Sequence, residues 1–342
     1  MKILVGLSGG VDSAFAAKKL LDEGHEVAAV TLVMHEFAET EGAKKTAEHL
    51  GISHFVVDCR NSFINIIKNN FTREYAAGRT PNPCILCNER VKFRILHDYA
   101  VENGFDRIAT GHYARVLSLY TETGVRYAVG CAEDVRKDQT YMLYRLPQDI
   151  LSRLVLPLSD ISKEEVRALL REEGAAVAEK KDSQEICFLP DGDHVGYIES
   201  VLGAFPEGDF IDPTGKIIGR HKGIIRYTVG QRKGLGISLG ERAFVTDINA
   251  ADNTVTLSPS YRGREEITVS DIVYSGITQP LSVRDEIMLV RVRYTAPLVS
   301  ARVTMYPDRT AKVTFDSPVK AAPGQSAVFY RDGAVMAGGF IN

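Results

Sequence analysis

The sequence predicts an α/β domain built on a parallel sheet, followed by two small β-rich, barrel-like domains. Over the first half of the 342 residues, short apolar runs alternate with helical patterns, which is typical of a parallel sheet covered on both faces. From about Gly203 the helical periodicity fades, and short alternating strands separated by Gly, Pro, Asp and Asn indicate small β-barrels. We therefore expect domains at residues 1–205, 206–269 and 270–342.

The elements follow from these patterns in chain order. Apolar, β-rich runs predict strands at 3–7, 27–33, 55–57 and 107–109, and the stretches between them predict helices at 14–23, 42–50, 62–77 and 88–102. Ligands of such sheets bind at the carboxyl ends of the strands. In the later part of the chain, alternation predicts strands at 242–248, 254–257, 286–294, 300–306, 311–315 and 326–330.

The composition is that of an ordinary globular protein, with 44% apolar and 25% charged residues. No apolar stretch approaches the length of a membrane span and the N-terminus lacks the zones of a secretory signal, so we expect a cytoplasmic protein without a membrane partner. Five cysteines, an odd number, argue against a disulfide framework. The net charge of −3 means that any polyanionic partner must meet a local basic patch.

The glycine-rich segment SGGVDS, residues 8–13, directly follows the first predicted strand and precedes a helix. Free N–H groups and the positive end of the helix dipole favour a bound phosphate there. Gly9 and Gly10 permit close backbone approach, and Asp12 could hold Mg²⁺ or orient the loop. The lysine of a Walker A motif is absent. The segment resembles the SGGxDS pyrophosphate loop of enzymes that cleave ATP between its α and β phosphates.

A loop with two cysteines, Cys84 and Cys87, follows the third predicted helix. Pro81 and Pro83 argue against a helix or a central strand through Pro83, so the loop should deliver Cys87 to the start of the next helix. A thiol at a helix N-terminus has a lowered pKa and becomes a better nucleophile or metal ligand. Alternatively, the two cysteines are packing residues or half of a structural zinc site.

Three further polar stretches contain candidate site residues. The segment 180–188 includes Cys187, which by itself would be a buried, inert thiol. The segments 111–115 and 136–141 follow the fourth predicted strand and a hairpin, and either could be a solvated loop. Gly111 and His112 come just after a strand end, where a nucleotide is expected.

A basic tract at residues 216–236 contains six lysines and arginines, and no acidic residue. Such a tract is a cationic surface suited to phosphates, and Arg291, Arg293 and Arg302 add a second cluster with Tyr294 available for stacking. The alternative is a solvated face of a β domain. The absence of a compensating carboxylate within the tract favours RNA contact.

Taken together, the motifs resemble those of the tRNA-specific 2-thiouridylase family: SGGVDS, TPNPCILCN, GHYAR, KDQTYML, DSQEICF, GRHKGIIRYTVGQRKGLGI and PGQSAVFY. The resemblance spans almost the entire chain. It implies an ATP-pyrophosphatase-like (adenine nucleotide alpha hydrolase-like) first domain and an enzyme that places sulfur on the wobble uridine in the anticodon loop of certain tRNAs. It also implies ATP and Mg²⁺ as cofactors, and a sulfur donor such as a cysteine desulfurase or a persulfide relay protein as a partner.

The resemblance further implies roles for individual residues. Transfer of AMP would activate the C2 oxygen of uracil, Cys187 would carry the incoming sulfur as a persulfide, and Cys87 would be the partner nucleophile. The target base would be extruded into the site to lie against Asn82, Pro83 and Cys84. ATP would contact Gly6, Leu7, Ser8, Gly9, Gly10, Val11, Asp12, Ser13, Leu32 and Gly111. The tRNA would contact His112, Lys137, Asp138, Gln139, Arg293, Tyr294 and Gln325.

Cys84 departs from the pattern of several relatives, which carry an Asp three residues before the nucleophile as a general acid or base. Either another group or water then moves the proton, or Cys84, Cys87 and Cys187 ligate a [4Fe–4S] cluster whose open iron binds the transferred sulfur. The cluster route is the alternative to the persulfide route. Cys59 and Cys131 are expected to be bystanders.

Two functions of other classes fit fewer of these features. An ATP-dependent amide or C–N ligase would share the pyrophosphate loop, but it would leave the cysteines and the basic tract without a role. A non-catalytic RNA-binding module with a structural zinc on Cys84 and Cys87 would consume no ATP.

Overall fold

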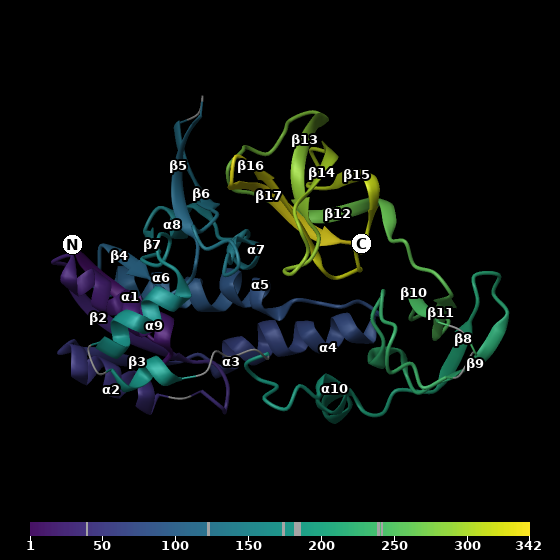
Figure 1. Ribbon diagram of the computed structural model, residues 1–342, viewed down its shortest axis with the longest axis horizontal. Helices are drawn as coiled ribbons and strands as arrows, with labels where there is room; N and C mark the ends of the chain where they lie inside the picture. Colours follow the sequence, from purple (N-terminus) through teal and green to yellow (C-terminus); the bar gives the residue numbers. More distant parts are fainter. Residues whose placement is uncertain (39, 122–123, 173–174, 181–185, 238–239, 241) are drawn as a thin grey trace.

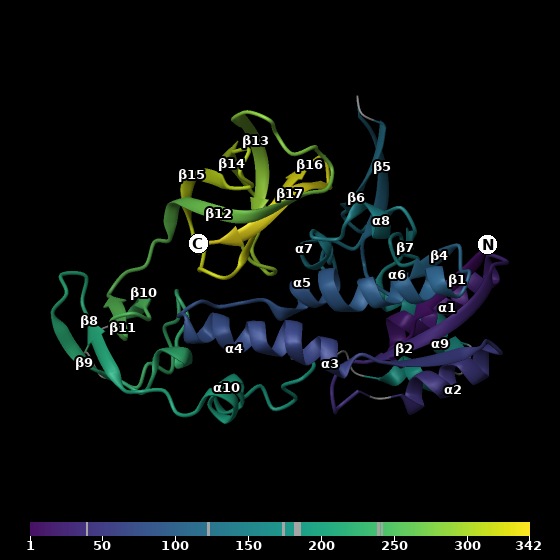
Figure 2. The ribbon, with the colours of Figure 1, turned by 180° about the vertical axis from the view of Figure 1, so that it is seen from behind.

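The computed structural model describes residues 1–38, 40–121, 124–172, 175–180, 186–237, 240 and 242–342. Figure 1 shows an α/β part that contains the N-terminus, a small β-sheet drawn in green, and a yellow-green β part that contains the C-terminus. Seen from behind in Figure 2, the helices α3 and α4 lead from the α/β part toward the small sheet. This order of one α/β part and two β parts confirms the predicted fold class, whereas the predicted domain limits stay predictions.

The first part is built on a five-stranded sheet with the order β3-β2-β1-β4-β7 and parallel pairings throughout. The carboxyl ends of these strands therefore meet at one edge of the sheet, which is where ligands of such folds bind. The strands are β1 (Lys2–Gly6), β2 (Glu26–Val33), β3 (His54–Asp58), β4 (Arg107–Ala109) and β7 (Leu154–Val155).

Helices cover both faces of this sheet. Ile3 of β1 packs with Ala17 and Leu20 of α1 on one face, whereas Leu4 packs with Leu96 of α6 on the other. Because neighbouring residues of a strand point to opposite faces, a strand covered on both sides is apolar without alternation. The helices are α1 (Val11–Asp22), α2 (Glu41–Leu50), α6 (Phe93–Glu102), α7 (Thr140–Leu143), α8 (Gln148–Leu151) and α9 (Lys163–Glu172), with the short 3₁₀ helix η3 (Ala176–Glu179).

Two helical runs connect the sheet to the rest of the molecule. The first contains α3 (Arg60–Phe63), the π-helical turn η1 (Ile64–Lys68) and α4 (Asn69–Ala76), and the second contains α5 (Pro83–Cys87), the π-helical turn η2 (Asn88–Lys92) and α6. The helix expected to start at residue 88 therefore begins at Pro83 instead. Proline is accepted there because the first residue of a helix has no intrahelical N–H bond to lose. None of the described helices is long and apolar enough to cross a membrane.

The small sheet of the second part has four strands in the order β10-β11-β8-β9. The strands predicted at 242–248 and 254–257 are confirmed as β10 and β11. Phe210 and Val245 of this sheet share a hydrophobic cluster with Phe71 of α4 and with Phe188, so the core of the second part continues into the first. The elements are α10 (His194–Leu202), β8 (Gly208–Ile211), β9 (Ile217–His221), η4 (Ile224–Arg226), β10 (Phe244–Asn249) and β11 (Thr254–Ser258).

The C-terminal part is an antiparallel barrel, as predicted. Its strands pair in the order β12-β15-β14-β13-β16-β17, and a further pairing of β12 with β17 closes the ring. Val303, Val313 and Phe329 are fully buried in its core. The strands are β12 (Arg264–Tyr274), β13 (Arg284–Arg291), β14 (Val299–Met305), β15 (Ala311–Val319), β16 (Ser326–Arg331) and β17 (Ala334–Ile341).

A hairpin from the first half of the chain, β5 (Arg115–Thr121) and β6 (Gly124–Gly130), extends the sheet of the barrel. Gly130 of β6 pairs with Ala334 of β17. The core beneath this contact is continuous, because Leu4 of β1 and Val328 of β16 belong to one hydrophobic cluster. The barrel is therefore seated on the α/β part through a shared core.

Candidate active site

The segment predicted to bind phosphate, residues 8–13, follows β1 and leads into α1, and it is called the phosphate loop below. Ser8 and Ser13 are joined by their hydroxyl oxygens at 3.1 Å, and the Ser8 N–H donates to the Ser13 hydroxyl at 3.1 Å. The N-cap residue of α1 is Gly10, which has no side chain to cap the first N–H groups of the helix. This helix N-terminus can therefore direct backbone donors at an anion.

Two glycines bring other backbone segments against this loop. Gly9 has φ of +70° and lies on Ala43 of α2, because a Cβ at Gly9 would be 2.9 Å from the Ala43 nitrogen. A Cβ at Gly111 would lie 2.5 Å from the Asp12 carbonyl carbon and 2.7 Å from the Ser13 nitrogen. Glycine at 111 therefore lets the chain after β4 pack directly on the loop.

Two lysines from distant parts of the chain reach the loop. The Lys163 ammonium, at the start of α9, is 2.6 Å from an Asp12 carboxylate oxygen, which also accepts a hydrogen bond from the Tyr113 hydroxyl at 2.9 Å. Lys180 donates to the Gly9 carbonyl at 3.2 Å. The sequence did not predict that either lysine contacts the loop. Lys180 belongs to the polar segment 180–188 that contains candidate site residues, whereas no motif or pattern around Lys163 marks it as a site residue. Of the two roles considered for Asp12, these contacts favour orientation of the loop.

The helix α5 carries Cys84 in its first turn and Cys87 at its end. Asn82 is the N-cap, and its side-chain oxygen accepts a hydrogen bond from the Cys84 N–H at 3.2 Å. The prediction that Cys87 starts a helix and has a lowered pKa is therefore wrong. Cys87 lies one turn further on and is only 6% exposed, and this burial raises its pKa to about 12.

Cys84, Cys87 and Cys187 come close enough for their charges to interact, although they belong to two distant segments. The surrounding protein disfavours a thiolate and raises the pKa of Cys187 to about 11, and it raises the pKa of Cys84 as well. Lys92 of η2 opposes this effect at each of the three thiols. Near neutral pH all three side chains are therefore protonated thiols that share Lys92 as a neighbouring cation.

The residue after Cys187 anchors its segment. Phe188 is buried, and its ring meets Phe63 and Phe71 edge-on with centroid separations of 5.6 and 5.4 Å. Cys187 itself is exposed. Residues 181–185 of the same motif lie outside the described residues.

The thiols lie at the same edge of the sheet as the phosphate loop. The Cys87 sulfur is 3.8 Å from the sulfur of Met34, which directly follows β2, and Leu32 lies near the end of β2. Since β1 and β2 are parallel, their carboxyl ends share one edge. A second methionine, Met142 of α7, borders Asn82, whose amide nitrogen is 3.5 Å from the Met142 sulfur.

Several residues predicted to contact tRNA make hydrogen bonds within the protein. The His112 ring nitrogen Nδ1 is 2.8 Å from the Thr110 hydroxyl, and burial lowers the pKa of His112 well below its usual range, so the imidazole is neutral at pH 7. Gln139 accepts a hydrogen bond from the Tyr113 N–H at 2.9 Å. The Lys137 N–H donates to the Asp134 carbonyl at 3.0 Å.

Asp138 is buried between the α/β part and the barrel. Its carboxylate accepts a hydrogen bond from the Thr140 hydroxyl at 2.6 Å and lies 3.3 Å from the Arg291 guanidinium of β13. Further along the barrel, Arg293 donates to the Val229 carbonyl at 3.0 Å, and the Tyr294 ring is 6.3 Å from that of Tyr141.

All three parts of the molecule meet at Thr80, just before α5. The Thr80 N–H donates to the Pro323 carbonyl at 2.8 Å, and the Gln325 amide donates to the Thr80 carbonyl at 2.6 Å. From the second part, the Thr228 hydroxyl is 3.3 Å from the Thr80 hydroxyl. A Cβ at Gly324 would be 2.9 Å from the Thr80 nitrogen. Both β parts therefore position the segment that leads to Asn82 and the first two cysteines.

The basic tract at 216–236 is partly neutralised by carboxylates from outside it. Arg220 pairs with Asp209 at 2.8 Å, and Arg226 pairs with Glu199 at 2.9 Å. The absence of acidic residues within the tract therefore overstated its charge, because folding brings these partners to it. Besides Arg220, four cations of the tract are exposed: Lys216, Lys222, Arg232 and Lys233.

Within the described residues, no group of three or more His, Cys, Asp or Glu side chains is arranged to hold a metal ion. The remaining two cysteines have other environments. Cys59 is buried and its thiol donates to the Val33 carbonyl at 3.3 Å, and Cys131 is half-buried.

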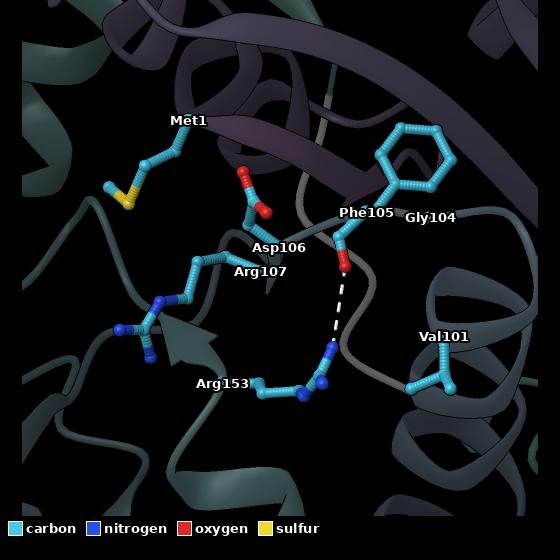
Figure 3. A pocket seen from close by; sticks show the side chains of 7 residues that line it. All are labelled: Met1, Val101, Gly104, Phe105, Asp106, Arg107 and Arg153. Atoms are coloured by element: carbon cyan, nitrogen blue, oxygen red, sulfur yellow. Dashed lines mark hydrogen bonds between the residues drawn. The ribbon is translucent and has the colours of Figure 1, made fainter.

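A depression lies at the opposite edge of the sheet (Figure 3). Its lining includes Met1 before β1 and Arg107 at the start of β4, and Arg153 donates to the Phe105 carbonyl there at 3.3 Å. These are the amino ends of the strands. The described residues that line it include none of the predicted site residues, so we assign the candidate site to the carboxyl edge.

Three family models match the chain in succession. They are described as the tRNA methyl transferase HUP domain at residues 1–191, the tRNA methyl transferase PRC-barrel domain at 196–259 and the aminomethyltransferase beta-barrel domain at 264–341. A phosphate-loop sheet followed by these two β domains defines a class of tRNA-modifying enzymes with an N-terminal HUP domain.

Relatives of nearly equal length identify the family within this class. The tRNA-specific 2-thiouridylase MnmA of Treponema denticola is 42% identical over 100% of this chain and 98% of its own length, and that of Clostridium acetobutylicum is 40% identical over 99% of both. The chain belongs to the tRNA-specific 2-thiouridylase family. Among solved structures, NMN synthetase from Francisella tularensis is 20% identical over 53% of this chain and 66% of that chain, with a TM-score of 0.34.

Proposed function

We propose that this protein is an ATP-dependent sulfurtransferase that replaces the C2 oxygen of the wobble uridine of tRNA with sulfur. The relatives named tRNA-specific 2-thiouridylase support this activity. The observation that carries the proposal is that Cys84, Cys87 and Cys187 lie close enough for their charges to interact, with Cys87 against Met34 at the edge of the sheet that also bears the phosphate loop. An amide or C–N ligase would use the loop but would need no converging thiols.

The first step activates the uracil. Its C2 oxygen attacks the α-phosphorus of ATP, the new O–P bond forms as the bond to the β-phosphate oxygen breaks, and pyrophosphate leaves while N3 loses its proton. The N–H groups at the start of α1, with Ser8 and Ser13, would bind the phosphates. Mg²⁺ would arrive with ATP as its chelate. We assign no step to it.

The second step transfers sulfur. The terminal sulfur of a Cys187 persulfide attacks C2. The Cys87 thiol loses its proton to water and attacks the Cys187 sulfur. The C2–S bond forms, the S–S bond of the persulfide breaks, AMP leaves with the former C2 oxygen, and N3 regains a proton from solvent. The two cysteine sulfurs supply the two electrons that reduce the transferred sulfur, and they end as a disulfide. A thiol reductant and a persulfide-donating protein then restore Cys187.

The alternative route uses a [4Fe–4S] cluster on Cys84, Cys87 and Cys187. Within the described residues, no group of three or more His, Cys, Asp or Glu side chains is arranged to hold a metal ion, so we derive no step through the cluster. Water is then the group that moves the proton in place of the Asp found in relatives, because the raised pKa of Cys84 makes its thiol a poor acid.

One experiment separates these routes. Anaerobically purified parent, Cys84→Ser, Cys87→Ser, Cys187→Ser and the control Cys131→Ser are assayed for iron, sulfide and ATP-dependent sulfur transfer to unmodified tRNA. We expect an active, iron-free parent, loss of transfer in Cys87→Ser and Cys187→Ser, and activity in Cys84→Ser and Cys131→Ser. Loss of iron and activity in all three site variants would establish the cluster route. Transfer that survives both Cys87→Ser and Cys187→Ser would overturn the proposal.

A further inference from the structure

We propose that Lys163 and Lys180 are the phosphate-binding cations of the pyrophosphate loop, and that they stabilise the pyrophosphate released on adenylation. This inference rests on the proposed function, because it takes the loop to be an ATP site. It assigns to two residues outside the loop the task that a lysine within the sequence motif performs in Walker A loops.

The charge of the loop itself shows why outside cations are needed. Residues 6–13 contain one carboxylate, Asp12, and no lysine or arginine. The N-terminus of a helix contributes only about half a positive charge. The β and γ phosphates of ATP carry several negative charges, so the helix end alone leaves most of that charge without compensation.

The first cation at the loop is the Lys163 ammonium. Its side chain is 6% exposed, and its ammonium lies 2.6 Å from the Asp12 carboxylate, which is 34% exposed. A buried ammonium requires an anionic partner, and Asp12 provides it in the structure. An ammonium carries three N–H groups, so it can bridge a carboxylate and a phosphate oxygen or pass from one to the other. Lys163 is therefore a cation held at the loop.

The second cation at the loop is the Lys180 ammonium. Its ammonium donates to the Gly9 carbonyl at 3.2 Å, at the turn where Gly9 and Gly10 open the backbone to an anion. A carbonyl is a neutral acceptor. When ATP binds, the Lys180 ammonium can exchange this carbonyl for a phosphate oxygen. The new hydrogen bond joins two charged groups and is therefore stronger than a bond to a neutral acceptor.

Other lysines near the loop have different partners. Lys19, in the last turn of α1, donates to the Pro157 carbonyl and to Asp160, both at 2.9 Å. Lys45 of α2 is exposed and lies 3.7 Å from Glu41. Lys163 and Lys180 are distinguished from these two by direct contacts with loop atoms. Lys45 is therefore a suitable control.

The test measures binding of magnesium pyrophosphate, ATP and AMP by titration calorimetry to the full-length parent and to Lys163→Met, Lys180→Met and Lys45→Met. Loss of one charge-assisted contact should lower the affinity for pyrophosphate and for ATP about tenfold in each site variant. The affinity for AMP should stay within about twofold of that of the parent. Lys45→Met should match the parent. Lys163→Arg and Lys180→Arg should recover most of the pyrophosphate affinity, because they keep the charge.

Lys163→Met also leaves Asp12 without its cation, and the added repulsion could weaken phosphate binding by itself. The double variant Asp12→Asn, Lys163→Met removes that repulsion. If pyrophosphate still binds weakly to the double variant, the result supports a direct contact between Lys163 and the phosphate. If the double variant regains the affinity of the parent, the assignment of Lys163 as a phosphate-binding residue is overturned. At the Gly9 turn, the atom that accepts the Lys180 hydrogen bond is a neutral carbonyl, so Lys180→Met adds no carboxylate repulsion at that contact.

The outcomes also separate this inference from the proposed function. A parent that binds neither ATP nor pyrophosphate would refute the ATP site and the lysine assignment together. A parent that binds both, with Lys163→Met and Lys180→Met binding pyrophosphate equally well, would refute the lysine assignment alone. Thermal unfolding of each variant confirms that the compared proteins are folded.

Discussion

The Cys187 thiol illustrates how its surroundings set the reactivity of one side chain. Its pKa is raised to about 11, so the proton stays on sulfur at pH values where an ordinary cysteine is ionised. In a variant with Cys59, Cys84, Cys87 and Cys131 changed to serine, the rate of alkylation by iodoacetamide should therefore rise about tenfold per pH unit from pH 7 to pH 10. The rate is measured by mass spectrometry. A plateau near pH 8.5 would contradict the raised pKa.

A substitution at Gly111 tests whether the chain after β4 must pack directly on the backbone of the phosphate loop. In Gly111→Ala the new Cβ would meet the Asp12 and Ser13 backbone at 2.5 and 2.7 Å, and backbone cannot yield as a flexible side chain can. We expect a loss of about 1–3 kcal/mol in the free energy of unfolding, together with weaker ATP binding. Denaturant titration and calorimetry measure the two effects.

Gly6→Ala is the matched control for stability. Its Cβ would meet Leu96 at 3.5 Å and Thr110 at 3.6 Å, which are ordinary contacts, and Gly6 lies at the end of the same strand that precedes the loop. Its free energy of unfolding should stay within about 1 kcal/mol of the parent. Equal destabilisation in both variants would mean that the contact at Gly111 is not the cause.

At the scale of elements, one buried arginine joins three of them. Arg145, which follows α7, is 2% exposed; its guanidinium bonds Glu89 of η2 and Asp271 of β12, each at 2.8 Å. Arg145→Met would leave the Glu89 carboxylate without this partner in a largely buried site. We expect a loss of about 3 kcal/mol in the free energy of unfolding, measured by denaturant titration.

The control for this prediction is an exposed ion pair of the barrel. Arg302 lies 2.7 Å from Asp285 and its side chain is 60% exposed, so Arg302→Met should cost less than about 1 kcal/mol. Similar losses in the two variants would show that the buried site does not strengthen the Arg145 contacts.

Some elements could be predicted from sequence and others could not, for local reasons. The strand at 107–109 and the helix at 42–50 have clear apolar patterns within their own residues, and both occur as predicted within a residue. The start of α5 was missed because proline was read as a barrier, whereas Asn82 and Pro83 form an N-cap and first residue. The union of β6 with β17 leaves no local pattern, since it depends on two surfaces that meet only after folding.

For the whole molecule, a negative net charge has to be reconciled with a polyanionic substrate. The exposed cations Lys222, Arg232 and Lys233 of the second part should contact tRNA phosphates under the proposed function. Their triple alanine variant should bind tRNA more weakly, and the slope of log affinity against log salt should fall by about two. Filter binding or fluorescence anisotropy between 50 and about 200 mM salt measures the slope.

A triple alanine variant of exposed cations on the α/β part is the control for charge itself. Lys44 and Lys45 of α2 and Arg171 of α9 are exposed by 60, 71 and 54%. Their removal changes the net charge equally but should leave the salt slope unchanged. An equal fall in both variants would assign tRNA attraction to net charge rather than to the second part.

The sequence by itself determined the α/β sheet, the two β parts, the phosphate loop and the family, because periodicity, turn residues and motif order are written in neighbouring residues. Only the tertiary structure decided the surroundings of the site: that Lys163 and Lys180 reach the loop, that Cys87 is buried, and that Asp209 and Glu199 neutralise part of the basic tract. Burial and charge pairing arise between segments far apart in the chain, so they exist only once the chain has folded.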